Sequence, residues 1–321
     1  MNILQDRNKR LITEFILVGF PYFHGYQPLL FVVLLVIYLE ILIGNTVILT
    51  VIVMDAKLHK PMYFFLGNLT VLDLTLTTTT IPKMLALVLF NDSTISFMAC
   101  FIQMCLLDTL GNFECFLLLV MAYDRYIAIC NPLHYTSIMN QKFNIQITTG
   151  SFVAACIVNV SISVFTAQLP FYGPNKISHC FCDHFFISRL TCADITSLTI
   201  WAMCIVFICV FTPFLLVVLS YINILKAVLK INSTAGRWKT FSTCSSHLIV
   251  VIIYYVSIIA SYSLFTLGSD YDNIHALGTI FSSILAPALN PFIYALRNKD
   301  VQEALKMLIR HKRLMVRTIM G

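Results

Sequence analysis

The chain has 321 residues, of which 59% are hydrophobic and 11% are charged, and its formal net charge is +6. One soluble domain cannot bury that much apolar surface, so the composition excludes an ordinary soluble protein and favours a membrane protein. The excess of basic residues suits an anionic membrane surface and requires no nucleic-acid partner.

Seven apolar runs follow one another along the chain, and each exceeds the roughly 20 residues that cross a bilayer. They lie at 28–53, 61–90, 98–123, 145–170, 197–225, 242–267 and 274–296. Because these runs are continuously apolar and do not alternate, they exclude a transmembrane β-barrel. We therefore predict an all-α integral membrane protein, a seven-transmembrane helix bundle.

The parts outside the bundle predict its orientation. Residues 1–27 form an N-terminal arm in which we identify no cleavable signal peptide. Most lysine and arginine residues lie in the loops after the first, third and fifth spans and in the tail. By the positive-inside rule the arm is extracellular, the transmembrane domain covers 28–296, and residues 297–321 are cytoplasmic.

The tail carries its own pattern. Residues 297–313 alternate apolar with basic side chains. That alternation predicts a short basic amphipathic helix along the inner membrane surface, with membrane lipid as a partner. A disordered basic tail is the alternative.

Motifs of catalysis are absent from the sequence. It has no glycine-rich phosphate loop, no H-E-x-x-H and no nucleophile elbow, so we expect no enzyme activity and no metal centre. Ionisable residues instead lie in the predicted spans, where they are costly and usually mark function. They are Glu40, Asp73, Asp108, Glu114 and Asp124. We identify no partner for Glu40.

Asp124 and Arg125 place opposite charges side by side at the inner end of the third span. An arginine that is held by its neighbour in one state and released in another is the kind of bistable element that a switch needs. The alternative is an arginine that extends its charge to the membrane surface.

Motifs spread along the chain resemble those of the odorant receptors, a family of rhodopsin-like (class A) G-protein-coupled receptors. The motifs are Gly44-Asn45, the string from Leu58 to Leu69, the string from Met121 to Tyr135, Ser220-Tyr221, the string from Lys239 to His247 and the string from Asn290 to Asn298. They occur in the family's order, and together they are highly specific.

The resemblance implies that a small volatile or hydrophobic odorant binds among the outer halves of the third, fifth, sixth and seventh helices. Binding would shift the population of receptor states and activate an olfactory-type stimulatory heterotrimeric G protein, which raises cyclic AMP. The implied location is the plasma membrane of sensory cilia. The implied switch and coupling surface comprises Asp124, Arg125, Tyr126, Tyr221, Lys239 and Tyr294.

Two other functions stay open at this point. A small-molecule receptor outside olfaction is the nearer alternative, although the strings at 61–69 and 239–247 argue against it. A membrane transporter is the more distant one, because the sequence shows no inverted repeat and no matching pair of broken helices.

Four of the eleven cysteines lie towards the predicted outer side, namely Cys100, Cys180, Cys182 and Cys192. The resemblance pairs Cys100 with Cys182. The family often has a further loop cysteine where this chain has Tyr172, so we hypothesise that Cys180 replaces it and pairs with Cys192. Alternatively, the cluster from His179 to His184 holds zinc or copper.

The family's usual glycosylation sequon in the N-terminal arm is missing. Asn91 begins the one sequon on the predicted outer side, which makes it the candidate glycosylation site.

The resemblance also implies a polar centre in the lower half of the bundle. Its members are Asn45, Asp73, Glu114 and Asn290. Related receptors hold a sodium ion or ordered water there, and two carboxylates that close would share a cation or a proton. Plain hydrogen bonding between helices is the alternative.

Asp108, Asn112 and Cys115 form one stripe of the third span, because residues three and four apart share a helix face. If the stripe faces the cavity, the Asp108 carboxylate accepts hydrogen bonds from an alcohol or pairs with an amine, and carboxylic acids bind poorly. The expected apolar walls are Phe207, Tyr255, Ile258, Tyr262 and Ile280. The alternative is ordinary packing of these side chains, with a polar neighbour for Asp108 on the fourth or fifth helix.

Overall fold

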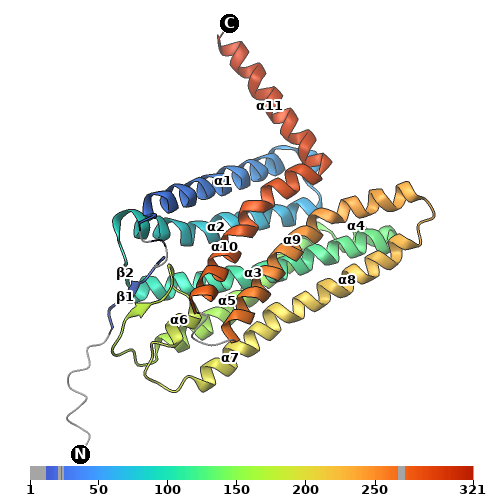
Figure 1. Cartoon of the computed structure of the whole chain (residues 1–321). Coiled ribbons are helices and arrows are strands. Elements are labelled where there is room, and N and C mark those ends of the chain that lie inside the picture. The colour runs from blue at the N-terminus through green and yellow to red at the C-terminus, as the bar shows by residue number, and fades with distance from the viewer. Residues whose placement is uncertain (1–11, 21–22, 24, 267–271, 321) are drawn as a thin grey trace, which may run out of the picture.

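A computed structural model of the chain describes residues 12–20, 23, 25–266 and 272–320, and helices dominate these residues. Figure 1 shows the long helices side by side in one bundle, with the strands gathered at one end. In chain order the elements are β1 (Glu14–Leu17), α1 (Gln27–Met54), η2 (Ala56–Leu58), α2 (Pro61–Phe90), β2 (Thr94–Ser96), α3 (Phe97–Cys130), η3 (Pro132–His134), α4 (Tyr135–Ile138), α5 (Gln141–Ala167), β3 (Lys176–Ile177), α6 (His184–Ser188), α7 (Thr196–Val206), the π-helix η4 (Phe207–Phe211), α8 (Thr212–Leu229), α9 (Thr234–Thr266), α10 (Asp272–Arg297) and α11 (Lys299–Met320).

Six helices in the described ranges are long and apolar enough to cross a membrane. They are α1, α2, α3, α5, the continuous helix Thr196–Leu229 that α7, η4 and α8 form, and Gly278–Leu296 within α10. A shorter apolar helix, Cys244–Ile259, lies within α9 and completes the predicted set. The all-α bundle of seven spans is therefore confirmed.

Capping residues explain where several spans begin and end. The Ser96 hydroxyl accepts a hydrogen bond from the Ala99 amide at 3.3 Å and starts α3. The Asn140 side chain starts α5 by accepting from the Phe143 amide at 2.9 Å. At the end of α2, Asn91 has a φ of +52°, the left-handed conformation of a helix C-cap.

α3 lies at the centre of the bundle. In its most apolar stretch 56% of the residues are buried, against 22% in α1 and in the helix Thr196–Leu229. It contacts α2, α5, α8 and α9. The outer surfaces of α1 and α8 are apolar instead, with exposed residues such as Val36, Ile43 and Leu215, as a surface that faces lipid requires. α3 therefore links the two ends of the bundle through its interior.

A proline in α10 explains how α1 packs against that helix. Pro291 has no N–H, so the carbonyl of Pro287 loses its helical hydrogen-bond donor. The Asn45 side chain of α1 supplies one, with its Nδ2 3.1 Å from that carbonyl oxygen. Gly44 permits the approach, because a Cβ atom there would lie 2.9 Å from the Pro291 Cβ.

A small sheet covers one end of the bundle and adds to the predicted fold. β1 pairs antiparallel with β2 and parallel with β3, which joins the N-terminal arm to the loops before α3 and α6. Phe15 of β1 is fully buried and stacks on Phe97 with ring centroids 5.6 Å apart. The disulfide Cys100–Cys182 lies at this end. We call it the disulfide end, and the opposite end, where Arg125 lies, the Arg125 end.

α11 follows α10 at the Arg125 end and leads away from the bundle (Figure 1). Val301 and Ala304 are buried where α11 meets α1 and α10, whereas Lys306 is exposed. The Tyr63 hydroxyl of α2 donates to the Asp300 carboxylate at 3.0 Å and fixes the start of α11. The predicted amphipathic C-terminal helix is present, and it extends further along the chain than predicted.

Candidate functional site

A cavity of about 490 Å³ lies between α3, α5, α7, α9 and α10, near the disulfide end. α6 and the residues around it form its roof. Most of its lining surface is apolar, with polar side chains of several helices set among it, a combination that suits a small organic molecule. The apolar walls include Leu107, Ile162, Leu198, Ala202, Met203, Val206, Val210 and Ile258.

Two of the predicted polar residues face this cavity. Asp108 and Asn112 lie one turn apart on α3 and both line it, as their spacing predicts. The Asn112 side chain donates to Oδ1 of Asn159 on α5 at 3.1 Å. Within the described part of the chain, no hydrogen bond or ion pair reaches the Asp108 carboxylate. The polar residue on α5 therefore bonds to Asn112 and not to Asp108, and Asp108 faces the cavity.

One predicted wall residue lies elsewhere. Phe207 is 66% exposed on the outer surface of η4, where a membrane protein meets lipid, and it does not line the cavity. Val206, which precedes it, and Val210, which lies about one turn further on, line the cavity instead.

The other residues that were predicted to form the walls lie in different places. Tyr255 is buried against Phe214 of α8, with ring centroids 4.8 Å apart, and its neighbour Tyr254 lines the cavity instead. Ile280 packs at the edge of the core near the disulfide end and is not among the lining residues. The side chain of Tyr262 lies outside the described residues.

The roof of the cavity is missing from the sequence prediction. It is formed by Phe181, Asp183, His184, Phe185, Ser188 and Arg189. A signal was present, because residues next to a cysteine that is tethered to the top of α3 must lie over the space beside that helix. The His184 Nε2 is 3.2 Å from the Thr166 hydroxyl, and desolvation lowers the pKa of His184 while the charge of Asp183 opposes part of that change. The imidazole is therefore neutral near pH 7.

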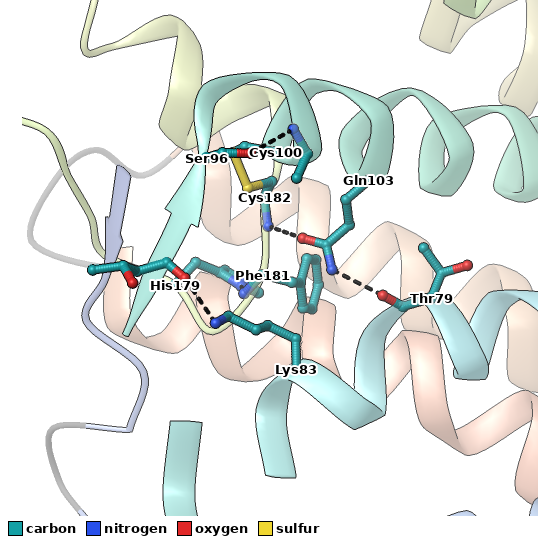
Figure 2. The surroundings of a disulfide bond; sticks show 10 residues. Thr79, Lys83, Ser96, Cys100, Gln103, His179, Phe181 and Cys182 are labelled. Atoms are coloured by element: carbon teal, nitrogen blue, oxygen red, sulfur yellow. Dashed lines mark hydrogen bonds between the residues drawn. A yellow bond between two sulfur atoms is a disulfide. The ribbon is translucent and has the colours of Figure 1, made fainter. Parts of the chain in front are cut away.

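The predicted disulfide between Cys100 and Cys182 is confirmed. Figure 2 shows Gln103 of α3 beside it, between the loop and α2. The Gln103 Oε1 accepts from the Cys182 amide at 3.0 Å, and its Nε2 donates to the Thr79 carbonyl at 2.8 Å. The roof is thus fastened to both α2 and α3.

The second predicted bridge, Cys180–Cys192, is wrong, because both residues are thiols. Cys180 is fully buried, with its Sγ 3.7 Å from the His179 Nδ1. Cys192 is exposed, and its Sγ lies 3.1 Å from the Tyr172 carbonyl oxygen. A metal at this cluster also lacks support, because the disulfide removes Cys182 as a thiolate ligand and no triad of His, Cys, Asp or Glu in the described ranges is arranged to hold an ion.

The predicted polar centre is only partly assembled. Asn290 donates to the Asp73 carboxylate at 2.9 Å, and both line a small void together with Asn45. Glu114 is buried close enough for its charge to interact with Asp73, but it lines the large cavity. One oxygen each of Asp73, Glu114 and Asn290 has no hydrogen-bond partner among the described residues. These residues therefore lie between the cavity and the Arg125 end with unused acceptors.

The predicted ion pair forms at the Arg125 end. Arg125 Nε donates to Asp124 Oδ2 at 2.9 Å, and both residues are buried. The Tyr135 hydroxyl of α4 donates to the other Asp124 oxygen at 2.8 Å, and burial next to that charge raises the pKa of Tyr135. Because Arg125 is only 8% exposed, the alternative of an arginine that extends to the membrane surface does not hold.

The other predicted switch residues lie around this pair. The Tyr221 hydroxyl bonds to His247 Nδ1 at 2.7 Å and joins α8 to α9, a contact that the sequence prediction missed. Tyr126 packs with Tyr221 in the same apolar cluster. Tyr294 is buried, and its hydroxyl has no partner in the described ranges. The side chain of Lys239 lies outside the described residues.

Two further predicted residues have clear positions without a tested role. Asn91 is exposed at the end of α2, beside the ion pair between Lys83 and Asp92 at 2.8 Å. Glu40 of α1 turns one oxygen into the interior near Gly44, and no group among the described residues bonds to that oxygen. Glycosylation of Asn91 stays a prediction, and nothing in the structure explains Glu40.

Comparisons with known proteins extend over almost the whole chain. A family model described as "Olfactory receptor" matches residues 34–312. Olfactory receptor 2AT4 of Homo sapiens is 45% identical over 293 residues, which cover 91% of this chain and 91% of that protein. Olfactory receptor 6N1 of Homo sapiens is 43% identical over 299 residues (92% and 94%), and Olfactory receptor 1f45 of Rattus norvegicus is 38% identical over 313 residues (95% and 97%).

Proposed function

Because the chain belongs to the olfactory receptor family, we propose that it binds small volatile or hydrophobic odorants in the cavity between α3, α5, α7, α9 and α10. Binding activates an olfactory-type stimulatory heterotrimeric G protein at the Arg125 end, and that G protein raises cyclic AMP. Members of this family are multi-pass membrane receptors and not enzymes, so the cavity serves recognition and no bond-making chemistry is required.

The main support for this proposal is that α3 extends from the cavity to the Arg125 end. Asp108 of α3 faces the cavity, and Arg125 of the same helix forms the ion pair at the other end, about 25 Å away along the helix axis. Tyr254 of α9 lines the cavity and also donates its hydroxyl to the Gly111 carbonyl of α3 at 2.7 Å. A ligand that changes how α9 packs on α3 therefore acts on the helix that carries the switch.

The mechanism is a shift of population between two arrangements. In the present arrangement, Asp124 pairs with Arg125 and also accepts a hydrogen bond from Tyr135, and the Tyr221–His247 bond holds α8 to α9. A ligand that fits the other arrangement better raises its share by no more than its differential affinity for the two. Release of Arg125 from Asp124 would then make its guanidinium available to the G protein.

We place the disulfide end outside the cell and the Arg125 end inside, in the plasma membrane of sensory cilia. A disulfide persists in the oxidising exterior. On the other side, the basic α11 would lie against the anionic lipid of the inner leaflet.

We propose the polar centre as the binding site of a sodium ion. Asp73, Glu114 and Asn290 would hold it, because each has an unused oxygen and hard cations prefer oxygen ligands. The void that Asn45, Asp73 and Asn290 line has no room for a water molecule, so binding would require these side chains to move apart. Without a cation, a proton shared between the two carboxylates would relieve their repulsion.

The test is a pair of assays on cells that express the chain at the surface. An odorant panel should raise cyclic AMP in a dose-dependent way, and no panel member should be transported across the membrane. Odorant uptake without a cyclic AMP response would reject the receptor in favour of a transporter.

A further inference from the structure

We infer that the ligand of this receptor is a small amine whose ammonium group pairs with Asp108 while its apolar body fills the rest of the cavity. The inference rests on the proposed function, because it specifies the ligand class of the same cavity. It starts from a carboxylate that faces this cavity without a hydrogen bond or ion pair from any described residue. An unpaired carboxylate in a low-dielectric site is costly, so a ligand that neutralises it gains the most from binding.

The groups around Asp108 favour a cation. Asp183 of the roof also lines the cavity, and its charge interacts with that of Asp108, so the local potential is negative. The amide nitrogen of Asn112 is already used by Asn159, which leaves the Asn112 oxygen as an acceptor near Asp108. The nearby His184 imidazole is neutral and does not supply the missing positive charge.

This arrangement distinguishes an amine from an alcohol. An ammonium group has several N–H donors and a full positive charge, so it can satisfy the Asp108 carboxylate and the Asn112 oxygen together. A hydroxyl has one donor and leaves the negative charge in place. Arg189 is a cationic residue of the cavity lining, and its guanidinium lies 4.0 Å from the centre of the Phe185 ring at the exposed edge of the roof. A carboxylate ligand would have to bind at that edge, away from Asp108.

The test compares ligands of the same skeleton on the purified full-length receptor. The probes are hexylamine, 1-hexanol and hexanoic acid, and benzylamine, benzyl alcohol and benzoic acid. Ligand binding is read as a rise in the melting temperature of the receptor, which requires no G protein. We expect both amines to stabilise the wild-type receptor at lower concentration than their alcohols, and both acids to be the weakest.

Three variants sharpen the comparison. Asp108→Asn should raise the amine concentration for half-maximal stabilisation by about 10- to 100-fold, the loss of one charge-assisted pair, and leave the alcohols unchanged. Asp108→Glu keeps the charge and should keep the preference for amines. The matched control is Asp194→Asn, which removes an exposed carboxylate that bonds Thr196 near the same end but does not line the cavity.

Amines that rank below their acids in the wild-type receptor would overturn the inference and point to Arg189, and this ranking needs no variant to fold. Equal amine affinity in Asp108→Asn and the wild type would overturn it as well. Binding of amines through Asp108 without a cyclic AMP response would leave the ligand class intact and reject the signalling proposal. A cyclic AMP response to alcohols, with no binding of amines, would keep the proposed function and reject the ligand class.

Discussion

Among single residues, Arg125 gives the most direct test of the switch. A buried ion pair such as Arg125–Asp124 contributes little net stability, so a role in switching explains it better than a role in folding. Arg125→Ala should remove the odorant-stimulated cyclic AMP response while the receptor still binds ligand in the thermal assay. The control is Arg310→Ala, which removes an exposed arginine of α11. A full response of Arg125→Ala at equal surface expression would show that the ion pair does not couple the receptor.

Asn45 offers a second test, because it replaces a hydrogen-bond donor that the α10 backbone lacks. Its Nδ2 bonds both the Ile41 carbonyl of its own helix and the Pro287 carbonyl of α10, each at 3.1 Å. Asn45→Leu leaves the Pro287 carbonyl buried without a donor and should reduce stability by about 1–3 kcal/mol. The measurement is the melting temperature of the unliganded receptor.

The matched control for Asn45 is Asn68→Leu. Asn68 makes the same bond to its own helix, to the Phe64 carbonyl at 2.8 Å, and among the described residues it bonds to no other helix. An equal fall in melting temperature in the two variants would mean that the bond between α1 and α10 adds no stability beyond that of the bond within each helix.

Among the elements, the contact of α1 with α10 depends on the absence of a side chain at Gly44. A Cβ atom there would meet the rigid Pro291 ring at 2.9 Å, whereas a Cβ atom at Gly67 would find Leu49 at an ordinary 3.9 Å. Gly44→Ala should therefore lower the melting temperature, although alanine favours helices. Gly67→Ala should leave it unchanged or raise it. If Gly44→Ala raised the melting temperature as much as Gly67→Ala does, α1 and α10 would have space between them that the structure does not show.

The helices themselves were predictable because their length in apolar residues is set by the bilayer. The sheet was not, since β1, β2 and β3 have two to four residues each and too little alternation to be recognised. α9 also begins at Thr234, about two turns before its apolar run at 242, because a helix can continue into polar residues once it leaves the membrane.

The site shows where prediction from sequence fails in a membrane protein. Asp108 and Asn112 were placed correctly on the cavity, because polar residues in a span rarely face lipid. Phe207 and Tyr255 were placed wrongly, since lipid is as apolar as the protein interior and an aromatic residue fits either side. The Cys180–Cys192 bridge failed because Cys180 is enclosed beside His179 while Cys192 is exposed.

For the whole molecule, the orientation in the membrane can be tested with one exposed thiol. Cys192 is exposed near the disulfide end, in the loop before α7. A membrane-impermeant maleimide should label it on intact cells, and Cys192→Ser should lose that label. Labelling of Cys192 only after the cells are permeabilised would place the disulfide end inside and reverse the proposed topology.

In the proposed mechanism, a ligand in the cavity controls the Arg125 end of the receptor. Gly111 lines the cavity, and a Cβ atom there meets nothing within 4 Å, so a side chain at this position enters the empty space without a clash. Gly150 on the exposed face of α5 has equally open surroundings away from the cavity and provides the control. The two glycines allow the same substitution inside and outside the proposed site.

The deciding measurement is the cyclic AMP dose–response of Gly111→Leu and Gly150→Leu to the odorants that activate the wild-type receptor, at equal surface expression. Gly111→Leu should abolish the response or raise the odorant concentration for a half-maximal response by at least about tenfold. The reason is that the added side chain occupies the space of the ligand. Gly150→Leu should respond as the wild type does. An unchanged response of Gly111→Leu would contradict the claim that this cavity is where the odorant binds.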